Sequence, residues 1–220
     1  MGASALWIWS ESHKAQLASE HCKWCTSSSM DSYFRDHLRW GNTKNADQLS
    51  NVLTFGVLPL TGLLAIQYLD SEFDKTEAYF LLAESVIYSS VLNQMTKYLV
   101  VRERPFVHQL AEDEKLKTKD PNDNNLSFYS GHTNMAFSIA AVLSQTTLKG
   151  SVKFPNMKWG LYGLATTAGY LRIAADKHYI SDVLVGAITG SLFSYSLTQE
   201  RQNSVQVFAL PTSLYLAYQF

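Results

Sequence analysis

The sequence lacks the features that mark several common classes of protein. Charged residues make up only 17% of the 220 positions and the formal net charge is −1, so the chain has neither a basic surface for nucleic acid nor an acidic tail. Five prolines are few, whereas aromatic residues reach 13%, which favours a well-packed helical protein over a disordered one. The length suits one domain. Recognition of an anion must therefore depend on a few local cations.

Cysteine is nearly absent. The only two, Cys22 and Cys25, have no second pair with which to complete a zinc site. A redox motif of the thioredoxin kind would need a helix directly after the pair, but the serine-rich stretch 26–29 indicates a loop. The pair therefore indicates a local disulfide or two idle thiols, with copper or zinc capture as a minor alternative.

Long apolar runs at helical spacing predict an all-α protein, a bundle of about five to six core helices. We expect helices over residues 10–21, 31–40, 45–69, 75–101, 135–148, 158–174 and 181–198. Pro59 and Gly62 should kink the first long run, and Asp74 should cap the next helix. The polar stretch 106–126 indicates a long exposed loop, and 205–220 suits a helix or a strand.

These elements divide the chain into three parts: an N-terminal cap of the same domain (1–45), the helical bundle that would hold a site (46–200) and a C-terminal segment (201–220). Several runs approach the roughly 20 apolar residues that cross a bilayer. Polar residues such as Glu84 and Arg172 interrupt them, and the mean hydropathy is −0.09. This composition favours a soluble or membrane-associated protein over an integral bundle. The first ten residues have no basic start and no long apolar stretch, so no secretory signal is expected.

Three short clusters carry the side chains that suggest chemistry. They are Lys97 followed after six residues by Arg104-Pro105, then Ser130-Gly131-His132, then Arg172, five residues, His178, three residues and Asp182. Each has an ordinary structural explanation, because cations favour helix C-termini and Ser or Asp favours the first turn. A Ser-Gly pair before an apolar helix also points unpaired N–H groups and the positive end of the helix dipole at an anion.

Together, in this order and at this spacing, the clusters resemble the type-2 phosphatidic acid phosphatase superfamily. That family includes bacterial class A acid phosphatases, lipid phosphate phosphatases and vanadium-dependent haloperoxidases. The resemblance covers about residues 45–198, and the departures are Tyr129 in place of the usual proline and Leu171 in place of the usual serine. It implies the helical fold of that family, which is the bundle that the apolar runs predict.

The resemblance also implies roles for these residues. His178 would be the nucleophile that forms a phosphohistidine, with Asp182 holding its other ring nitrogen. His132 would protonate the leaving alkoxide and then activate water. The phosphate would be bound by Lys97, Arg104, Arg172, the Ser130 hydroxyl and the Gly131 N–H. Three fixed cations suit a phosphoryl group whose charge spreads over its oxygens, so no metal ion is required.

The function implied is a metal-independent phosphatase acting on a phosphate monoester or diphosphate, with a phosphorylated lipid or a small phosphate ester as substrate. A small-molecule acid phosphatase, a vanadium haloperoxidase and a catalytically idle scaffold are the alternatives, although haloperoxidases of this family are longer chains. No cofactor is expected, but vanadate or phosphate can occupy the same cradle. We expect a periplasmic or other extracytoplasmic location, soluble or membrane-associated, with an integral protein as the alternative. The 106–126 stretch and the aromatic N-terminal cap are expected to border the pocket.

Overall fold

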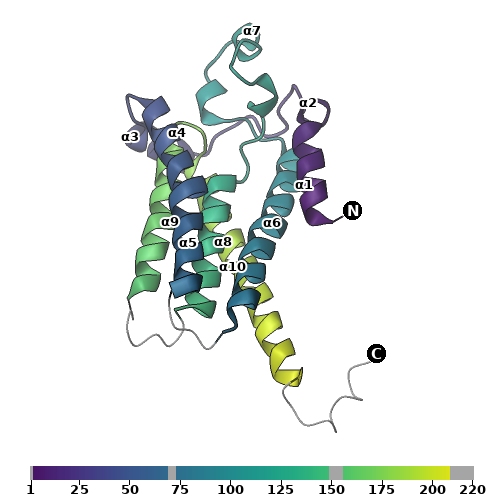
Figure 1. The fold of residues 1–220 in the computed structure, drawn as a ribbon. Helices are drawn as coiled ribbons and strands as arrows, with labels where there is room; N and C mark the ends of the chain where they lie inside the picture. The colour runs from purple at the N-terminus through teal and green to yellow at the C-terminus, as the bar shows by residue number, and fades with distance from the viewer. Residues whose placement is uncertain (1, 69–72, 149–155, 209–220) are drawn as a thin grey trace.

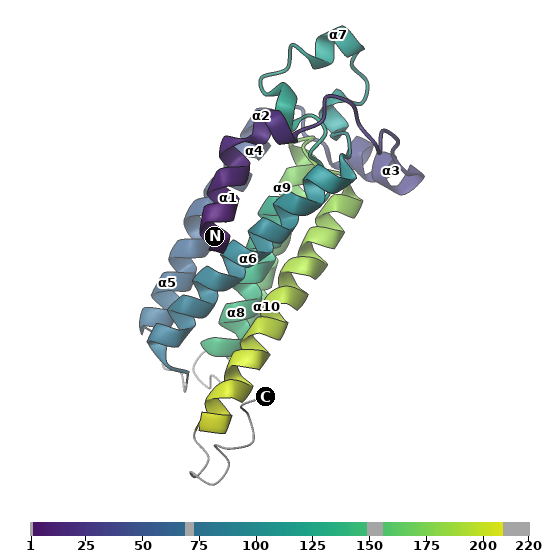
Figure 2. The same cartoon turned by 90° about the vertical axis from the view of Figure 1, so that its right-hand side faces the viewer.

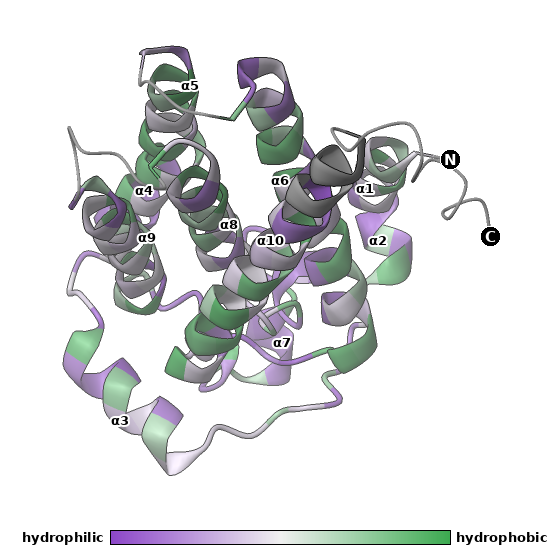
Figure 3. Ribbon diagram, turned by 90° about the horizontal axis from the view of Figure 1, so that it is seen from below, coloured by the Kyte–Doolittle hydropathy of each residue, from purple (hydrophilic) through white to green (hydrophobic). Residues whose placement is uncertain are grey.

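The protein is a bundle of long helices. The computed structural model describes residues 2–68, 73–148 and 156–208, and this part of the chain is helical with no β-strand beyond one isolated bridge. The prediction of an all-α fold is therefore confirmed. Helix α8 (Gly131–Thr146) lies at the centre, in contact with α5 (Leu58–Tyr68), α6 (Lys75–Val100), α9 (Met157–Ala174) and α10 (Ile180–Phe208) (Figures 1 and 3).

The core forms around α8, because ten of the sixteen residues of this helix are buried. Ile139, Val142 and Leu143 are almost completely buried among side chains of α5, α6 and α9. Helix α10 approaches even more closely, since a Cβ atom at Gly190 would lie only 2.3 Å from the backbone oxygen of Asn134. Only glycine allows the two backbones to meet at this distance. The start of α10 is thereby fixed beside the start of α8.

The first long run forms one continuous rod. It consists of α4 (Thr43–Val52), the π-helical turn η1 (Leu53–Val57) and α5. The irregularity that we expected at Pro59 takes the form of this π turn directly before it, because proline has no N–H to donate. At Gly62, by contrast, α5 simply continues. The next helix, α6, begins after Asp74, whose side chain accepts the N–H of Glu77, so the predicted cap is confirmed.

The N-terminal region differs from the prediction. The expected helix over 10–21 is wrong, because the helices are α1 (Ala3–Ser12) and the single turn α2 (Lys14–Leu17). The helix ends at residue 17. Beyond it the backbone is held by the Asn125 amide, which donates to the carbonyl oxygens of Ser19 and Glu20. Helix α3 (Ser29–Leu38) confirms the second expected helix within two residues at each end. Figure 2 shows α1 lying along α6.

Two other boundaries move. Helix α8 begins at Gly131, four residues before the predicted 135, because Ser130 caps it. Helix α10 continues past 198 and across the expected boundary at 200 to Phe208, so 205–208 are helical, and 209–220 lie outside the described residues. The stretch 106–126 is not a plain exposed loop. It overlaps η2 (Pro105–Val107), contains α7 (Glu112–Lys115) and η3 (Pro121–Asp123), and buries Val107 and Leu126.

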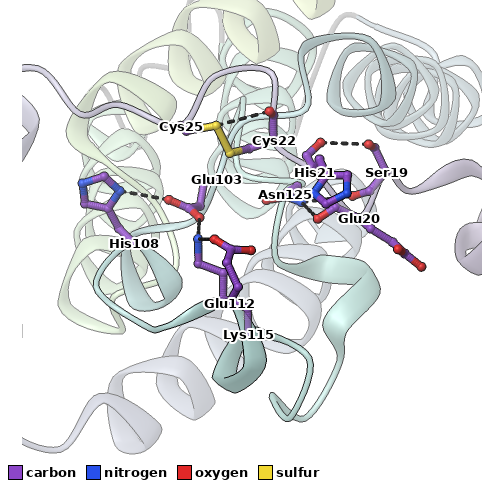
Figure 4. Close-up of a disulfide and its surroundings, with 10 residues drawn as sticks. All are labelled: Ser19, Glu20, His21, Cys22, Cys25, Glu103, His108, Glu112, Lys115 and Asn125. Carbon is purple, nitrogen blue, oxygen red and sulfur yellow. Dashed lines mark hydrogen bonds and ion pairs between the residues drawn. A yellow bond between two sulfur atoms is a disulfide. The ribbon is translucent and has the colours of Figure 1, made fainter.

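A disulfide lies beside the connection that follows α6 (Figure 4). Cys22 and Cys25 are bonded, as one of the two main interpretations of the pair predicted. The loop they close is hydrogen-bonded to the segment after α6, since Lys23 N–H donates to Val101 O and Glu103 N–H donates to Trp24 O. On the other side, the Glu103 carboxylate accepts from Lys115 and pairs with His108 (Figure 4). The backbone between α6 and η2 is therefore held from both sides.

Two helical rods are long and apolar enough to cross a membrane. They span Thr43–Tyr68 and Ile180–Arg201, and only 33% and 28% of their most apolar windows are buried. The core helix of a soluble protein would be mostly buried. Hydrophobic stretches also lie on the outside of α5, α6 and α10 (Figure 3). Their exposed side chains include Leu60, Leu64, Met95, Leu99, Ile188 and Leu192. This outward-facing apolar surface supports membrane association.

Candidate active site

The three sequence clusters meet at one end of the bundle, the end that carries α7 in Figure 1. Lys97 lies in the last turn of α6, and Arg104 follows that helix. Ser130 caps α8, and Gly131 and His132 are its first residues. Arg172 lies in the last turn of α9, His178 between α9 and α10, and Asp182 in the first turn of α10. The backbone joins them as well, because Ser130 N–H donates to Asp182 O over 3.1 Å. Every predicted site residue is thus brought to this end by the helix termini.

His178 is buried, with 2% of its surface exposed. Its Nε2 lies 3.5 Å from Arg104 Nη1, and its Nδ1 lies 3.6 Å from Asp182 Oδ2. Burial, and then repulsion from the guanidinium groups of Arg104 and Arg172, hold the pKa of His178 well below its usual value. The imidazole is therefore neutral near pH 7, and one ring nitrogen can act as a nucleophile.

Asp182 is fixed in the first turn of α10 and is completely buried. Its Oδ2 accepts the Ser127 hydroxyl at 2.5 Å and the Tyr179 N–H at 3.0 Å. Its Oδ1 accepts from Arg102 Nη1. A carboxylate with this many donors has one orientation, and in that orientation Oδ2 faces the His178 ring.

The cations of the site are paired with carboxylates that the sequence clusters do not contain. Arg104 donates through Nε to the Asp123 carbonyl at 2.9 Å, and its Nη2 lies 2.8 Å from Asp123 Oδ2. Burial opposes ionisation of Asp123, but Arg104 and the nearby ammonium groups outweigh it and lower the pKa of this carboxyl. Arg172 donates to Asp47 Oδ1 and, over 2.8 Å, to the Ser50 hydroxyl. A bound anion must share the two guanidinium groups with these carboxylates.

The turn at 129–131 is built for close contact. A Cβ atom at Gly131 would lie 2.9 Å from Asn93 Oδ1, so no side chain fits there. The same Asn93 amide donates to Tyr129 O over 2.7 Å and fixes the turn in which proline is usual. Ser130 is buried, and its hydroxyl accepts from the Thr133 hydroxyl at 2.9 Å. Ser130 caps the helix here, and its part in binding phosphate stays a prediction.

His132 contacts the rod formed by α4 and the π turn. Its Nε2 lies 2.6 Å from Asn51 Oδ1, and its ring meets Phe55 edge-on at a centroid distance of 4.8 Å. Asn51 and Phe55 come from η1 and the helix before it, so the irregular rod supplies one wall of the site. The imidazole also lines the groove described next.

An apolar groove of about 510 Å³ begins at the site and extends between α1, η1, α6 and α8. Its polar end is formed by Lys97, Gly131 and His132. The rest is mainly apolar, with Trp7, Ile8, Phe55, Val86, Ile87 and Met135. The aromatic N-terminal region therefore borders the pocket as expected. The 106–126 stretch does not line this groove and instead covers Arg104 through Asp123.

The comparison with protein families decides the identity of this fold. A family model described as the PAP2 superfamily matches residues 78–206. The chain belongs to the PAP2 superfamily.

Individual PAP2 relatives are distant in sequence. Phospholipid phosphatase 1 of Rattus norvegicus is 26% identical over 160 residues, which cover 63% of this chain and 56% of the relative. Phospholipid phosphatase 2 of Homo sapiens is 32% identical over 126 residues, 47% of this chain and 44% of the relative. A solved crystal structure, that of Aquifex aeolicus LpxE, is 28% identical with a TM-score of 0.49, over 79% of this chain and 88% of that one. The chain spans about half the length of the curated relatives it matches.

Sequence reasoning missed several residues of this PAP2 site. Asp47, Asp123 and Asn51 contact the expected site residues but lie outside the three clusters, and nothing in their local sequence marks them. Arg102 is different, because it lies two residues before Arg104 and is the largest fully buried side chain. A second arginine so close to Arg104, in a run of mostly apolar residues, was a signal that could have been followed. The described residues contain no group of three or more His, Cys, Asp or Glu that could hold a metal ion.

Proposed function

We propose that this chain hydrolyses the phosphate monoester or diphosphate of a lipid, without a metal ion, through a phosphohistidine on His178. One observation carries the proposal. A buried, neutral imidazole faces a guanidinium group on one side and a fixed carboxylate on the other, and Lys97 and His132, which lie at the same end of the bundle, form the polar end of an apolar groove. A phosphoryl group fits between the cations, and an apolar chain fits the groove.

In the proposed reaction, His178 Nε2 attacks phosphorus in line with the ester oxygen. The N–P bond forms as the P–O bond breaks, and His132 donates a proton to the departing alkoxide. His132 then takes a proton from water, which attacks phosphorus, and the N–P bond breaks to release phosphate and restore neutral His178. Asp182 stabilises the positive charge that the His178 ring carries while it is phosphorylated.

In the proposed reaction the cations stabilise the negative charge of the phosphoryl group. Arg104 and Arg172 are among the groups that repel the protonated form of the imidazole. Charge that develops on the equatorial phosphoryl oxygens is stabilised by the same groups, which are already in place and need no reorganisation. Lys97 completes the set, with its ammonium nitrogen 3.7 Å from the place where a Gly131 Cβ would be.

The groove favours a lipid over a small soluble ester. Its length runs along apolar side chains of α1, η1 and α6, and α1 itself carries exposed Trp7 and Ile8. The outward-facing apolar surfaces of α5, α6 and α10 would bring the site to a membrane surface, and we propose an extracytoplasmic or periplasmic side for it.

Two tryptophans of α1 offer a matched test of the lipid groove. Trp7 lines the groove and Trp9 does not, although their exposed fractions are 44% and 45%. Trp7→Ala should raise KM for a micellar lipid phosphate about fivefold, because roughly 1 kcal/mol of apolar contact is lost. KM for p-nitrophenyl phosphate should not change, and Trp9→Ala should leave both values unchanged.

The reaction itself is tested without added metal and with a chelator present. Brief reaction with a ³²P-labelled substrate should leave an acid-labile, base-stable label on wild type and none on His178→Ala. A rate that depends on a divalent ion, or a label that persists in His178→Ala, would end this proposal. Equal loss of lipid turnover in Trp7→Ala and Trp9→Ala would remove the groove from it.

A further inference from the structure

Arg102 lies behind the site and has no place in the reaction described above. Its guanidinium group is completely buried and joins two carboxylates, with Nη2 2.7 Å from Asp31 Oδ2 and Nη1 2.5 Å from Asp182 Oδ1. Nη1 also donates to the Ser181 hydroxyl over 2.7 Å. The guanidinium carbon lies close to two aromatic rings, with centroid distances of 3.9 Å to Trp24 and 4.4 Å to Tyr179.

Asp31 is as firmly placed as Arg102. It lies in the first turn of α3, where its Oδ2 accepts the Ser28 hydroxyl at 2.9 Å and its Oδ1 accepts the Ser181 N–H at 3.1 Å. Burial alone would raise the pKa of Asp31, but the hydrogen bonds from Ser181 and Arg102 bring it below its usual value. The carboxylate is therefore ionised at neutral pH. It comes from outside residues 78–206, the part that the PAP2 family model matches.

The charges of this trio do not cancel. Two carboxylates share one guanidinium group, so Asp31–Arg102–Asp182 carries a net charge of −1 in a buried place. If Arg102 were paired with Asp182 alone, it would neutralise that carboxylate and weaken its interaction with His178. Because Asp31 also pairs with the guanidinium group and offsets part of its positive charge, Asp182 keeps negative charge on the side that faces the imidazole.

We propose that Asp31 and Arg102 are positioning residues, which orient the Asp182 carboxylate toward His178 Nδ1 and leave it enough negative charge to stabilise the phosphorylated ring. This inference rests on the proposed phosphohistidine reaction. It also gives the N-terminal region a function, because α3 supplies a residue that acts on the reaction through Asp182.

The decisive variant is Asp31→Asn, which keeps the shape and removes the charge. Arg102 then pairs with Asp182 alone. We expect kcat for p-nitrophenyl phosphate to fall about tenfold with KM within twofold, because the charge on Asp182 matters most after the ring becomes positive. Arg102→Lys should cost more, about a hundredfold, since one ammonium group cannot bridge two carboxylates in the geometry of a planar guanidinium.

The pH profile separates positioning from simple structural support. With Asp182 neutralised more fully, the acid limb of kcat/KM should move down by about half a pH unit, since a weaker carboxylate favours the neutral imidazole. The other charged or titratable groups around His178 stay in place in this variant: Arg104, Lys97, Arg172, His132 and Asp123. A variant that merely loosens the fold would lower activity without moving the limb.

Arg35→Gln is the matched control. Arg35 also joins α3 to the turn after α9, through two bonds to Asp176 of 2.6 and 2.8 Å, but it does not touch Asp182. It should lower the unfolding temperature without changing kcat or the acid limb. Ser181→Ala, which removes one bond to Arg102, is the milder variant if Asp31→Asn does not fold. We expect about a threefold lower kcat at constant KM from it.

Each outcome decides one question. A tenfold loss of kcat with a shifted limb in Asp31→Asn, and neither change in Arg35→Gln, supports the inference. Equal effects of Asp31→Asn and Arg35→Gln, or an unchanged kcat in Asp31→Asn or Ser181→Ala, overturn it. Wild type without activity, or His178→Ala with near-normal activity, refutes the proposed function instead. Active wild type, inactive His178→Ala and a silent Asp31→Asn refute only the positioning role.

Discussion

In the proposed reaction Arg104 binds phosphate, so Asp123 should compete with phosphate for Arg104, and its removal should strengthen the binding of phosphate. Its carboxylate lies 2.8 Å from Arg104 Nη2. In Asp123→Asn the backbone carbonyl that accepts from Arg104 Nε is retained, as is the Lys177 carbonyl 3.2 Å from Nη1. The arginine therefore keeps its direction and loses only a negative neighbour.

The size of the effect follows from the charges. A carboxylate about 5 Å from one phosphate charge repels it by about 3 kcal/mol at an effective dielectric constant of about 20. The Asp123 side chain is 26% exposed, so solvent reduces this value, and about 1 kcal/mol is a reasonable net amount. The inhibition constant of phosphate should fall about fivefold. The lowered pKa of Asp123 keeps it ionised between about pH 5 and 8, so a change of the ratio in this range should come from the ionisation of phosphate and not from this carboxyl.

The assay is competitive inhibition of p-nitrophenyl phosphate hydrolysis by inorganic phosphate and by orthovanadate. Asp120→Asn is the control. Asp120 and Asp123 both form an ion pair with Lys14, at 2.9 Å and 3.1 Å, and this pairing is the only interaction that the two carboxylates have in common. Asp120→Asn should change both inhibition constants by less than twofold. Weaker inhibition of Asp123→Asn would show that the carboxylate orients Arg104 rather than competing for it, and would refute the reasoning.

Three further predictions follow from the geometry. His178→Ala should reduce kcat by about 10⁴ or more in a steady-state assay while the circular dichroism spectrum stays unchanged, and retained turnover would remove this residue as nucleophile. Burial and the neighbouring cations lower the pKa of His178, which reacts as the neutral form, and also the pKa of His132, which must carry the proton, so both limbs of kcat/KM should be displaced toward acid pH. An acid limb above about pH 6.5 would contradict this. Gly190→Ala should lower the unfolding temperature by about 5–10 °C, since its Cβ would lie 2.3 Å from Asn134 O, whereas Gly163→Ala, which meets nothing within 4 Å, should not.

The sequence was informative where one segment contains the whole interaction. Four positions separate His178 and Asp182, so a helix start between them brings the carboxylate to the ring from spacing alone. The cap at Asp74 and the extent of α9 are local in the same sense. The π turn before Pro59 shows the limit, because a proline predicts an irregularity without saying which hydrogen-bond pattern will accommodate it.

Interactions between distant segments could not be predicted. Arg102 meets Asp31 across 71 positions and Asp182 across 80, and only the folded bundle shows that one guanidinium group serves both. The same is true of α1. Its apolar side chains do not form a clear helical pattern in the sequence, and their positions are explained only by the contact of α1 with α6 and with the groove. The preference for a soluble or membrane-associated protein over an integral bundle also rested on an average, which conceals that many apolar residues of α5, α6 and α10 face outward.

All groups proposed for the reaction lie at one end of the bundle, and the described helices beyond them pack around the core of α8. In a bilayer, such an arrangement would restrict the proposed reaction to one side of the membrane. It would act on lipids of the leaflet whose head groups lie at the level of His178 and release phosphate on that same side. Lipids of the other leaflet would become substrates only after they crossed the membrane, so the rate of that crossing would limit how much of a mixed pool the enzyme could consume.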